Sequence, residues 1–346
     1  MMLAEIGIGK FSVLATAFLL TIIGVQVYRK IAVKFDIVAR RNFRTLHKTD
    51  VPKGSGIVFS LVYITLVFIL WTQGLVSNEL SIAICLGGFA ATIFGFIDDV
   101  IDVPAIIKLI VQISLCSFIV LSFGESPLLL STTHAPIKTG VLGMIVSVGI
   151  LVWLINLYNF MDGVDGMAAS GAVFICGTIS SVLFFASGNI ELGLIVALLA
   201  SSCSGFLIFN WPPASIFMGD AGSVFIGYVF GVLIMYTMLQ GDISIWTWIT
   251  VFGYFGIDTT TTLVLRIIHV KKWYGAHRSH AYQNLARIWD SHSKVLAVVI
   301  CYHLLWVLPL TILSISYAQY QEIICLLATF PVIIWTLKYG PLLSSD

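Results

Sequence analysis

Long apolar runs separated by short polar segments follow one another along almost the whole chain. Each run approaches the length of about 20 mostly apolar residues that a helix needs to cross a bilayer. The runs are continuous, whereas an outer-membrane β-barrel would alternate apolar and polar residues. We predict an all-α, polytopic integral membrane protein in which residues 1–346 form one domain. About eleven transmembrane helices are expected, near residues 11–28, 56–76, 80–97, 106–123, 139–158, 167–186, 192–209, 221–239, 244–265, 294–316 and 321–338.

The composition agrees with a membrane protein. Hydrophobic residues make up 59% of the chain and charged residues only 10%, whereas soluble domains carry about 25% charged residues. The 18 basic and 17 acidic side chains leave a formal net charge of +1. This composition excludes a soluble enzyme, a disordered chain and a protein with a broad basic surface for nucleic acid.

The basic residues divide unevenly between the two ends of the predicted helices. Of the 18, all except Lys10 and Lys138 fall on one face. The positive-inside rule places that face in the cytoplasm, with the N-terminus outside and the C-terminus inside. We therefore expect a multi-pass membrane protein. Its cytoplasmic face would hold the C-terminal tail and the loops 29–55, 98–105, 159–166, 210–220 and 266–293.

The acidic residues divide as well, although no rule of membrane insertion requires it. All five glutamates fall on the outer face, and ten aspartates fall on the predicted cytoplasmic face. Short carboxylates gathered on a basic surface suggest a site there that binds a metal ion and anions.

Two adjacent aspartates, Asp98 and Asp99, end the third predicted span. An ordinary polar helix end is the simpler interpretation. However, carboxylates at a helix C-terminus face the negative end of the helix dipole and destabilise it. The pair therefore needs a compensating cation, and Mg²⁺ or Lys108, at the start of the next span, could supply it.

Four polar residues recur at every third position at the end of the fifth predicted span, namely Asn156, Asn159, Asp162 and Asp165. On a helix or a tight 3₁₀ turn they form one winding polar stripe. A helix C-cap followed by a turn is the alternative, but it does not explain two amides and two carboxylates near the membrane surface. Polar groups at such a depth are costly and usually functional.

A further aspartate, Asp220, stands in the segment Phe-Met-Gly-Asp-Ala-Gly-Ser before the eighth predicted span. It could cap the helix. It could equally offer a carboxylate to Mg²⁺ beside backbone N–H groups that bind a phosphate. The residues leave both interpretations open.

Two basic loops supply candidate ligands for anions. The segment His277-Arg278-Ser279-His280 suits phosphate oxygens, because arginine can bind them through two parallel hydrogen bonds. A loop that only sets topology would explain the nearby lysines but not this segment, and a zinc site lacks a tetrahedral ligand set. Lys53 lies in a Pro-Lys-Gly-Ser-Gly turn that could bring it to an anion, although positive-inside charge explains it equally well.

This mixture of carboxylates, amides and basic side chains fits phosphoryl chemistry, in which two polyanions approach only after their charge is neutralised. The sequence has no GxxxxGKS/T phosphate loop, no G-x-S-x-G elbow and no HExxH. A lipid phosphate as one substrate would explain the embedded scaffold. Its tail would run between helices while its phosphate meets a soluble, nucleotide-activated donor.

The Asp-Asp, Asn-x-x-Asn-x-x-Asp-Gly-x-Asp-Gly and Phe-Met-Gly-Asp-x-Gly-Ser motifs resemble those of the polyprenyl-phosphate N-acetylhexosamine-1-phosphate transferases, glycosyltransferase family 4. The resemblance covers nearly the whole chain, with the motifs in the family's order. It implies transfer of a sugar 1-phosphate from a UDP-sugar to undecaprenyl phosphate, release of UMP and a need for Mg²⁺, with Mn²⁺ as a substitute. Membrane lipid would be a further partner, and a homodimer is left open.

The resemblance also implies roles for the motif residues. Asp98 and Asp99 would serve the lipid phosphate, one of them as a base, with Lys108 beside them. Asp162 would be catalytic, and Asp220 with Asn159 would hold the metal ion. The residues expected to bind the substrates are Lys53, Asn156, Asn159, Asp165, His277, Arg278 and His280.

The last motif departs from the family pattern. Many members carry His-x-His-His, whereas this chain has His277-Arg278-Ser279-His280-Ala281-Tyr282-Gln283, in which alanine replaces the last histidine and an arginine enters. The departure favours the branch that starts O-antigen synthesis, with N-acetylfucosamine, N-acetylquinovosamine or N-acetylglucosamine as the sugar. The peptidoglycan phospho-MurNAc-pentapeptide translocase is the alternative within the family. Direct attack by the lipid phosphate is favoured over a covalent aspartyl intermediate, because that phosphate is already an anionic nucleophile.

A transporter that uses the same polar loops as a gate is the alternative from another class. Transporters place ionisable residues near the bilayer midplane. Here only Asp258 lies within a predicted span, near its inner end and two helical turns before Arg266. Asp258 is therefore expected to orient site residues rather than to carry an ion.

Overall fold

The computed structural model describes residues 2–39, 50–124, 140–269 and 278–341, and of residues 2–11 the backbone alone. This part of the chain is almost entirely helical, which confirms the all-α fold class. The regular helices are α1 (Met2–Lys34), α2 (Gly56–Thr72), α3 (Asn78–Ile82), α4 (Gly88–Ile101), α5 (Ala105–Phe123), α6 (Gly140–Phe160), α7 (Met167–Val182), α8 (Ile190–Asn210), α9 (Gly219–Gln240), α10 (Ile245–His269), α11 (Ala281–Ile288), α12 (His292–Tyr302), α13 (Leu308–Ser316) and α14 (Gln321–Tyr339).

Short π-helical or 3₁₀-helical turns join some of these helices into longer continuous helices. The π-helical turns are η1 (Ala83–Gly87), η2 (Leu183–Ser187) and η3 (His303–Val307), and a 3₁₀ turn is η4 (Ala318–Tyr320). Within the described residues, ten continuous helices are long and apolar enough to cross a membrane, and α2 is a further apolar helix of 17 residues. Each predicted apolar run falls on one of these helices, with ends that differ by a few residues.

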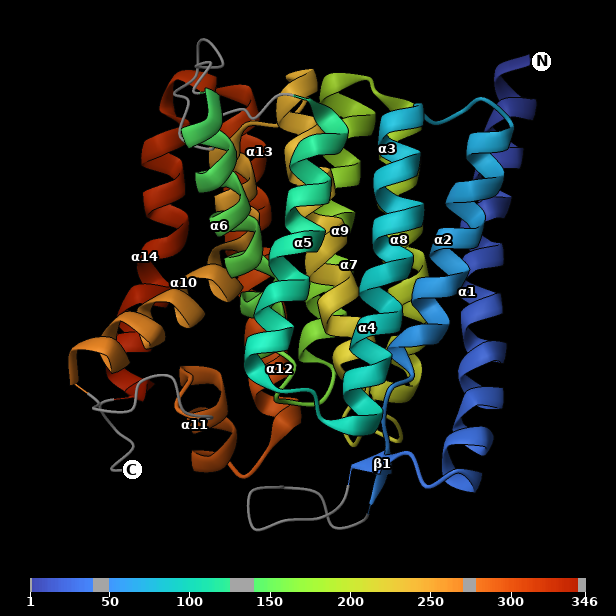
Figure 1. The fold of residues 1–346 in the computed structure, drawn as a ribbon. Helices are drawn as coiled ribbons and strands as arrows, with labels where there is room; N and C mark the ends of the chain where they lie inside the picture. The colour runs from blue at the N-terminus through green and yellow to red at the C-terminus, as the bar shows by residue number, and fades with distance from the viewer. Residues whose placement is uncertain (1, 40–49, 125–139, 270–277, 342–346) are drawn as a thin grey trace.

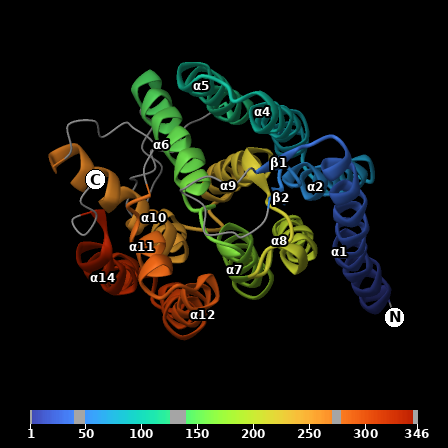
Figure 2. The same ribbon diagram turned by 90° about the horizontal axis from the view of Figure 1, so that it is seen from below.

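The helix α9 forms the centre of the bundle. It lies among the other helices when the molecule is viewed along the bundle (Figure 2) and contacts α2, α4, α5 and α6. In the most apolar stretch of 18 residues of α9, 83% of the residues are buried in the protein, the largest share among the described spans. A helix that is apolar on all sides is expected at such a position.

Glycines let the neighbouring helices approach the start of α9 closely. A Cβ atom on Gly95 of α4 would lie 2.3 Å from the carbonyl oxygen of Asp220. A Cβ atom on Gly56 of α2 would lie 2.1 Å from the backbone nitrogen of Gly222. Small residues commonly mediate such close contacts between membrane helices. The ends of α2 and α4 are thus held against the first turn of α9.

A small strand pair ties the segment before α2 to the same region. Strand β1 (Val38–Ala39) pairs antiparallel with β2 (Val51–Pro52), with Val38 opposite Pro52. The backbone then continues the pairing, because the N–H of Phe217 donates to the carbonyl of Pro52 at 2.8 Å. The N–H of Gly56 donates to the carbonyl of Met218 at 2.9 Å. The segment 51–56 therefore braces the residues that precede Asp220.

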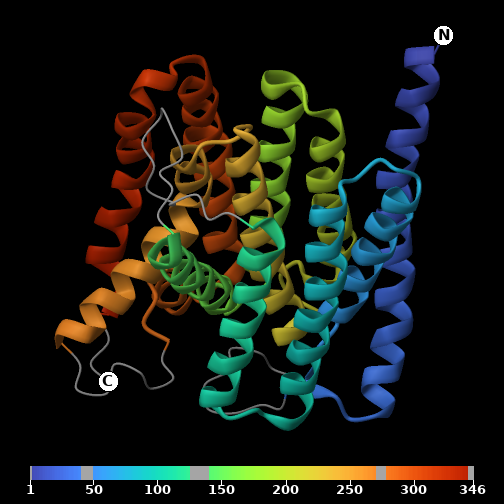
Figure 3. The same cartoon turned by 45° about the horizontal axis from the view of Figure 1, so that its top comes forward.

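The helix α10 departs from the upright arrangement of the bundle. Its second half runs obliquely outward beside α14 (Figures 1 and 3). The short helix α11 lies below it, near the start of α12 and at the same end of the molecule as β1 (Figure 1). This lower end also holds the end of α4 and the start of α5, and it is where the polar motifs meet.

Candidate active site

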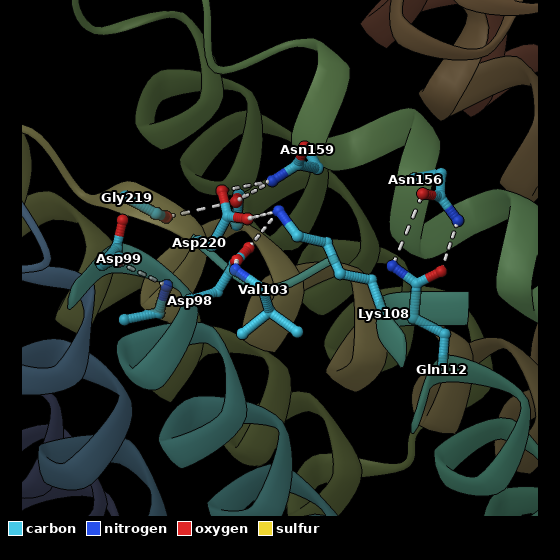
Figure 4. A network of polar contacts seen from close by, with 11 residues as sticks. Asp98, Asp99, Val103, Lys108, Gln112, Asn156, Asn159, Gly219 and Asp220 are labelled. Atoms are coloured by element: carbon cyan, nitrogen blue, oxygen red, sulfur yellow. Dashed lines mark hydrogen bonds and ion pairs between the residues drawn. The ribbon is translucent and has the colours of Figure 1, made fainter. Parts of the chain in front are cut away.

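An ammonium group lies between two carboxylates where α4, α5 and α9 meet (Figure 4). Lys108 Nζ forms an ion pair with Asp98 Oδ2 and lies 3.7 Å from Asp220 Oδ2. Asp98 also accepts a hydrogen bond of 2.7 Å from the backbone N–H of Val103, in the turn between α4 and α5. The structure confirms the expected contact of Lys108 for Asp98 but not for Asp99, and it adds Asp220 to the same cluster.

The neighbouring aspartate, Asp99, faces another direction. Successive residues on a helix point about 100° apart, and Asp99 is buried between α4 and α9. Its Oδ2 accepts a hydrogen bond of 3.0 Å from the backbone N–H of Ala221 in the first turn of α9. Gly219 has a φ of +69°, and a Cβ atom there would lie 2.3 Å from the same oxygen. Asp99 therefore caps α9 from α4.

The amide of Asn159 joins α6 to the cluster. Its nitrogen donates to Asp220 Oδ1 at 2.9 Å and to the Ser223 hydroxyl at 2.9 Å. The Ser223 hydroxyl in turn donates to the carbonyl of Gly219 at 3.1 Å. Four helices, α4, α5, α6 and α9, thus contribute side chains around Asp220, as Figure 4 shows. Two motifs that are about 60 positions apart in the sequence meet here.

The other asparagine of the motif, Asn156, pairs with a residue that sequence reasoning missed. Its nitrogen donates to Gln112 Oε1 at 2.7 Å, and Gln112 Nε2 donates back to Asn156 Oδ1 at 3.4 Å. Gln112 lies one helical turn beyond Lys108 on α5 (Figure 4). The sequence could have indicated Gln112. It is an amide in an otherwise apolar run, and it lies four positions after Lys108, so the two side chains share one face of the helix.

Asp162 lies in the turn that follows α6 and is half-buried. Burial raises the pKa of its carboxyl group well above the usual value, and the nearby carboxylates of Asp220, Asp99 and Asp165 raise it further. Among the described residues no hydrogen bond to this carboxyl group is found. Asp162 is therefore an acidic group held near other acidic groups, which is the setting in which a cation binds favourably.

Asp165, at the end of the same turn, contacts both the loop before α9 and the start of α12. Its Oδ2 accepts a hydrogen bond of 2.9 Å from the backbone N–H of Ala214 and lies 3.3 Å from His292 Nδ1. Asn210 makes a parallel link, because its side chain accepts from Gly166 N at 3.0 Å and donates to Ile216 O at 2.9 Å. These bonds join the turn after α6 to the loop that precedes α9.

The predicted basic ligands differ in how deeply they are buried. Lys53 is half-buried and follows β2, and a Cβ atom on the adjacent Gly54 would lie 3.5 Å from Asp99 Oδ2. Arg278 is exposed. His280 is buried, with its ring centroid 5.9 Å from that of Phe160, the last residue of α6. His277 lies outside the described residues.

The fold and the cluster define a class of protein. A helical membrane protein brings an ammonium group, carboxylates and an amide together at one end of its spans, next to a braced helix N-terminus. Such a set is suited to neutralising and orienting phosphate groups, because lysine attracts them and carboxylates can hold a metal ion against them. The class is a membrane-embedded enzyme that transfers a phosphoryl-containing group.

Comparisons with known proteins support one family. Residues 81–238 match the model of glycosyl transferase family 4, a stretch that contains Asp98, Lys108, Asn159 and Asp220. The chain is 26% identical to a probable undecaprenyl-phosphate N-acetylglucosaminyl 1-phosphate transferase of Bacillus subtilis over 297 residues. This alignment covers 83% of this chain and 81% of the relative.

Two further relatives act on related lipids or sugars according to their names. A decaprenyl-phosphate N-acetylglucosaminephosphotransferase of Mycobacterium leprae is 27% identical over 324 residues, 84% of this chain and 79% of the relative. A phospho-N-acetylmuramoyl-pentapeptide-transferase of Clostridioides difficile is 31% identical over 216 residues, 58% of this chain and 64% of the relative. These similarities support the polyprenyl-phosphate N-acetylhexosamine-1-phosphate transferase family and a sugar-1-phosphate transferase activity.

Proposed function

We propose that this protein transfers an N-acetylhexosamine 1-phosphate from a UDP-sugar to undecaprenyl phosphate and releases UMP. The observation that carries the proposal is the Lys108 ammonium group between Asp98 and Asp220 at the ends of three membrane helices. A lipid phosphate and a nucleotide diphosphate can reach such a place from the membrane and from water. The distribution of Lys and Arg supports a site on the cytoplasmic side, and the bacterial relatives support a bacterial inner membrane.

A magnesium ion is proposed at Asp220, with the amide oxygen of Asn159 as a second ligand and Mn²⁺ as a substitute. Among the described residues no group of three His, Cys, Asp or Glu side chains is arranged to hold a metal ion. Mg²⁺ usually takes only one or two carboxylates and completes its shell with substrate phosphates and water, so the oxygen ligands at this site fit it. When bound, the ion would neutralise charge on the diphosphate.

The reaction proposed is direct attack by the lipid phosphate. An oxygen of that phosphate bonds to the phosphorus next to the sugar, and the bond from this phosphorus to the bridging oxygen of the UDP-sugar breaks, so that UMP leaves. Lys108 holds the acceptor phosphate, and Asp98, paired with Lys108, accepts a proton where the phosphate still carries one. No covalent aspartyl intermediate is needed, because the phosphate is itself an anionic nucleophile.

The donor sugar is proposed to be N-acetylfucosamine, N-acetylquinovosamine or N-acetylglucosamine, and the product to start O-antigen or another surface polysaccharide. The support is the segment from Arg278 to Gln283, which departs from the His-x-His-His pattern. Its residue His280 packs against Phe160 at the end of α6, so the departure lies beside the motif of Asn159 and Asp162. The names of the Bacillus and Mycobacterium relatives support N-acetylglucosamine within this set.

The test is release of UMP by the purified protein with undecaprenyl phosphate and Mg²⁺. The donors compared are UDP-GlcNAc, UDP-GalNAc, UDP-FucNAc, UDP-QuiNAc and UDP-MurNAc-pentapeptide. Turnover with one of the proposed sugars and not with the pentapeptide donor supports the proposal. Turnover with the pentapeptide donor alone would assign the protein to the translocase reaction. No UMP from any donor, together with uptake of a solute into vesicles, would favour a transporter.

A further inference from the structure

One buried acidic residue is not used by the chemistry described above. Asp258 has an exposed fraction of 0% and lies just past the middle of α10, further from the inner end than the sequence predicted. Its two carboxylate oxygens accept hydrogen bonds from the first turn of α11, from Ala281 N at 3.1 Å and from Tyr282 N at 3.2 Å. His280, which precedes α11, supplies no capping bond from its own side chain. Asp258, which belongs to α10, therefore caps the N-terminus of α11 in place of the residue that precedes α11.

Two threonines complete the surroundings of Asp258. Thr262, one turn further along α10, donates to Oδ1 at 3.3 Å, and Thr336 of α14 lies 3.5 Å from the same oxygen. A buried carboxylate is stabilised by such donors and by the positive end of a helix dipole. Because Oδ1 binds groups of α10, α11 and α14 while Oδ2 binds α11 alone, the carboxylate is placed to fix the position of α11.

Tyr282 connects this helix turn to the catalytic motif. Its side chain is fully buried. The hydroxyl group donates to the carbonyl of Phe160 at 2.7 Å and accepts from the N–H of Gly163 at 3.1 Å. These two backbone groups bracket the turn that carries Asp162. A Cβ atom on Gly163 would lie 2.5 Å from the Tyr282 oxygen, so the contact leaves no room for a larger residue.

A second bond holds the segment before α11 to α10. Arg266 Nη1 donates to the Ser279 hydroxyl at 3.2 Å, and both side chains are buried. Asn284, in the first half of α11, donates to the carbonyl of Tyr339 at 2.6 Å at the end of α14. The short helix α11 is thus held on two sides and can act as a rigid support for Tyr282.

We propose that Asp258 and Tyr282 are positioning residues for the transfer reaction. Asp258 sets the place of the first turn of α11, and Tyr282 in that turn sets the backbone of residues 160–163 and with it the direction of Asp162. The inference rests on the proposed function for its kinetic test. It adds two residues that touch no substrate, one from α10 within the membrane and one from α11 outside it.

The first test compares Tyr282→Phe with the matched control Tyr254→Phe. Tyr254 is also a buried tyrosine, one turn before Asp258, but its hydroxyl group has no hydrogen-bond partner among the described residues. Tyr282→Phe is expected to lower kcat by about 10- to 100-fold, the effect of a displacement of about 1 Å in an active site. KM for undecaprenyl phosphate should stay within about twofold. Tyr254→Phe should leave kcat within about twofold.

Hydrogen exchange of the backbone provides a readout that does not depend on turnover. In Tyr282→Phe, peptides that cover residues 159–166 should exchange faster than in the wild type, because the Gly163 N–H loses its partner. Peptides from α9 should exchange at the wild-type rate. Unchanged exchange at 159–166 together with normal kcat would overturn the inference, and so would a general loss of protection that spreads over α9.

A double-mutant cycle tests whether Asp258 acts through Tyr282. Asp258→Asn keeps one acceptor oxygen and turns an NH₂ group towards the α11 N–H groups, so it should also lower kcat. In the double variant Asp258→Asn with Tyr282→Phe, kcat should be only slightly lower than in the more damaged single variant, because both substitutions disturb the same series of contacts. Fully multiplicative losses would overturn the coupling. If the wild type releases no UMP, the proposed function fails, and the exchange measurement alone decides the positioning role.

Discussion

The carboxylate of Asp99 accepts a hydrogen bond of 3.0 Å from the backbone N–H of Ala221, so that the end of α4 caps the start of α9. The adjacent Asp98 pairs instead with Lys108, whose ammonium group also lies 3.7 Å from Asp220. Two neighbouring residues of identical chemistry thus have different surroundings. One holds the helix that carries Asp220, and the other faces the ammonium group at the site.

The different surroundings predict different responses to substitution at position 99. Asparagine caps helices about as well as aspartate, whereas alanine at a cap costs about 0.5–2 kcal/mol. Asp99→Asn should therefore keep most of the thermal stability and a measurable part of the activity, and Asp99→Ala should lose both. Thermal unfolding and UMP release measure the two effects. Equal and complete inactivation by Asn and by Ala, with both proteins stable, would make Asp99 a catalytic group.

Position 98 should behave in the opposite way. Asp98→Asn keeps a side chain of the same size and the acceptor for Val103 N, but it removes the negative charge beside Lys108. If Asp98 is the base, kcat should fall by at least about 100-fold with little change in thermal stability. Near-normal turnover in this variant would assign the proton transfer to another group or to the solvent.

The acidic surroundings of Asp162 predict a gain in stability when its charge is removed. Because burial and neighbouring carboxylates raise its pKa, the folded protein binds this proton up to a higher pH than the unfolded chain does. Stability from this group is therefore lost as pH rises from about 4, the pKa in an unfolded chain, through the raised value. Asp162→Asn should unfold at a temperature about 2–4 °C higher without Mg²⁺, the shift for about 1 kcal/mol.

Two further measurements on Asp162→Asn complete this prediction. The loss of stability with rising pH should be smaller in the variant than in the wild type. The added stability that Mg²⁺ gives the wild type should also decrease, and UMP release should fall. A lower unfolding temperature in metal-free buffer would show that the Asp162 carboxyl group stabilises the fold and that the acidic groups do not repel one another.

The amide pair of Gln112 and Asn156 should stabilise the contact of α5 with α6. Gln112→Leu leaves the Asn156 amide with one partner fewer in a partly buried place and should cost about 1–2 kcal/mol. The double variant Gln112→Leu with Asn156→Leu should cost less than the sum of the two single variants, with a coupling of about 0.5–1.5 kcal/mol. Thermal unfolding of the four proteins measures this coupling, and strict additivity would show that the pair contributes nothing as a pair.

The close approach of α4 to α9 predicts a strong effect at Gly95. Gly95→Ala puts a methyl group 2.3 Å from the Asp220 carbonyl oxygen, so the helices must separate at a cost of about 1–3 kcal/mol. Activity should fall with stability, because Asp220 moves. Gly177→Ala in α7 is the matched control, since nothing lies within 4 Å of its Cβ position. If the two alanine variants behave alike, the contact is not as close as the structure places it.

The helices could be predicted from the sequence because length and apolar composition alone decide them. The pairing of Lys108 with the end of α4 could also be predicted, since two carboxylates at a helix C-terminus need a cation. The separate roles of Asp98 and Asp99 could not, because they depend on α9, whose contact with Asp99 is 122 positions away in the chain. The same holds for the bond of Asp165 with His292 and for the link of Tyr282 with Phe160.

The strand pair was beyond prediction for a different reason. Strands β1 and β2 have two residues each, too few for any alternation of apolar and polar positions to show. Asp258 is an intermediate case, because its place near the inner end of a span predicted an orienting role. Its partners on α11 became visible only in the fold, since the N–H groups of a helix carry no sequence signal.

The most direct test of the account is the Mg²⁺ dependence of UMP release by Asp220→Asn. The matched control is Asp242→Asn, an aspartate that follows the opposite end of α9 and accepts a hydrogen bond from Asn189. With undecaprenyl phosphate and the preferred UDP-sugar, Asp220→Asn should lose about 1,000-fold in kcat/KM and need more Mg²⁺, while remaining folded. Asp242→Asn should match the wild type. A folded Asp220→Asn protein with wild-type turnover and wild-type Mg²⁺ dependence would contradict the account.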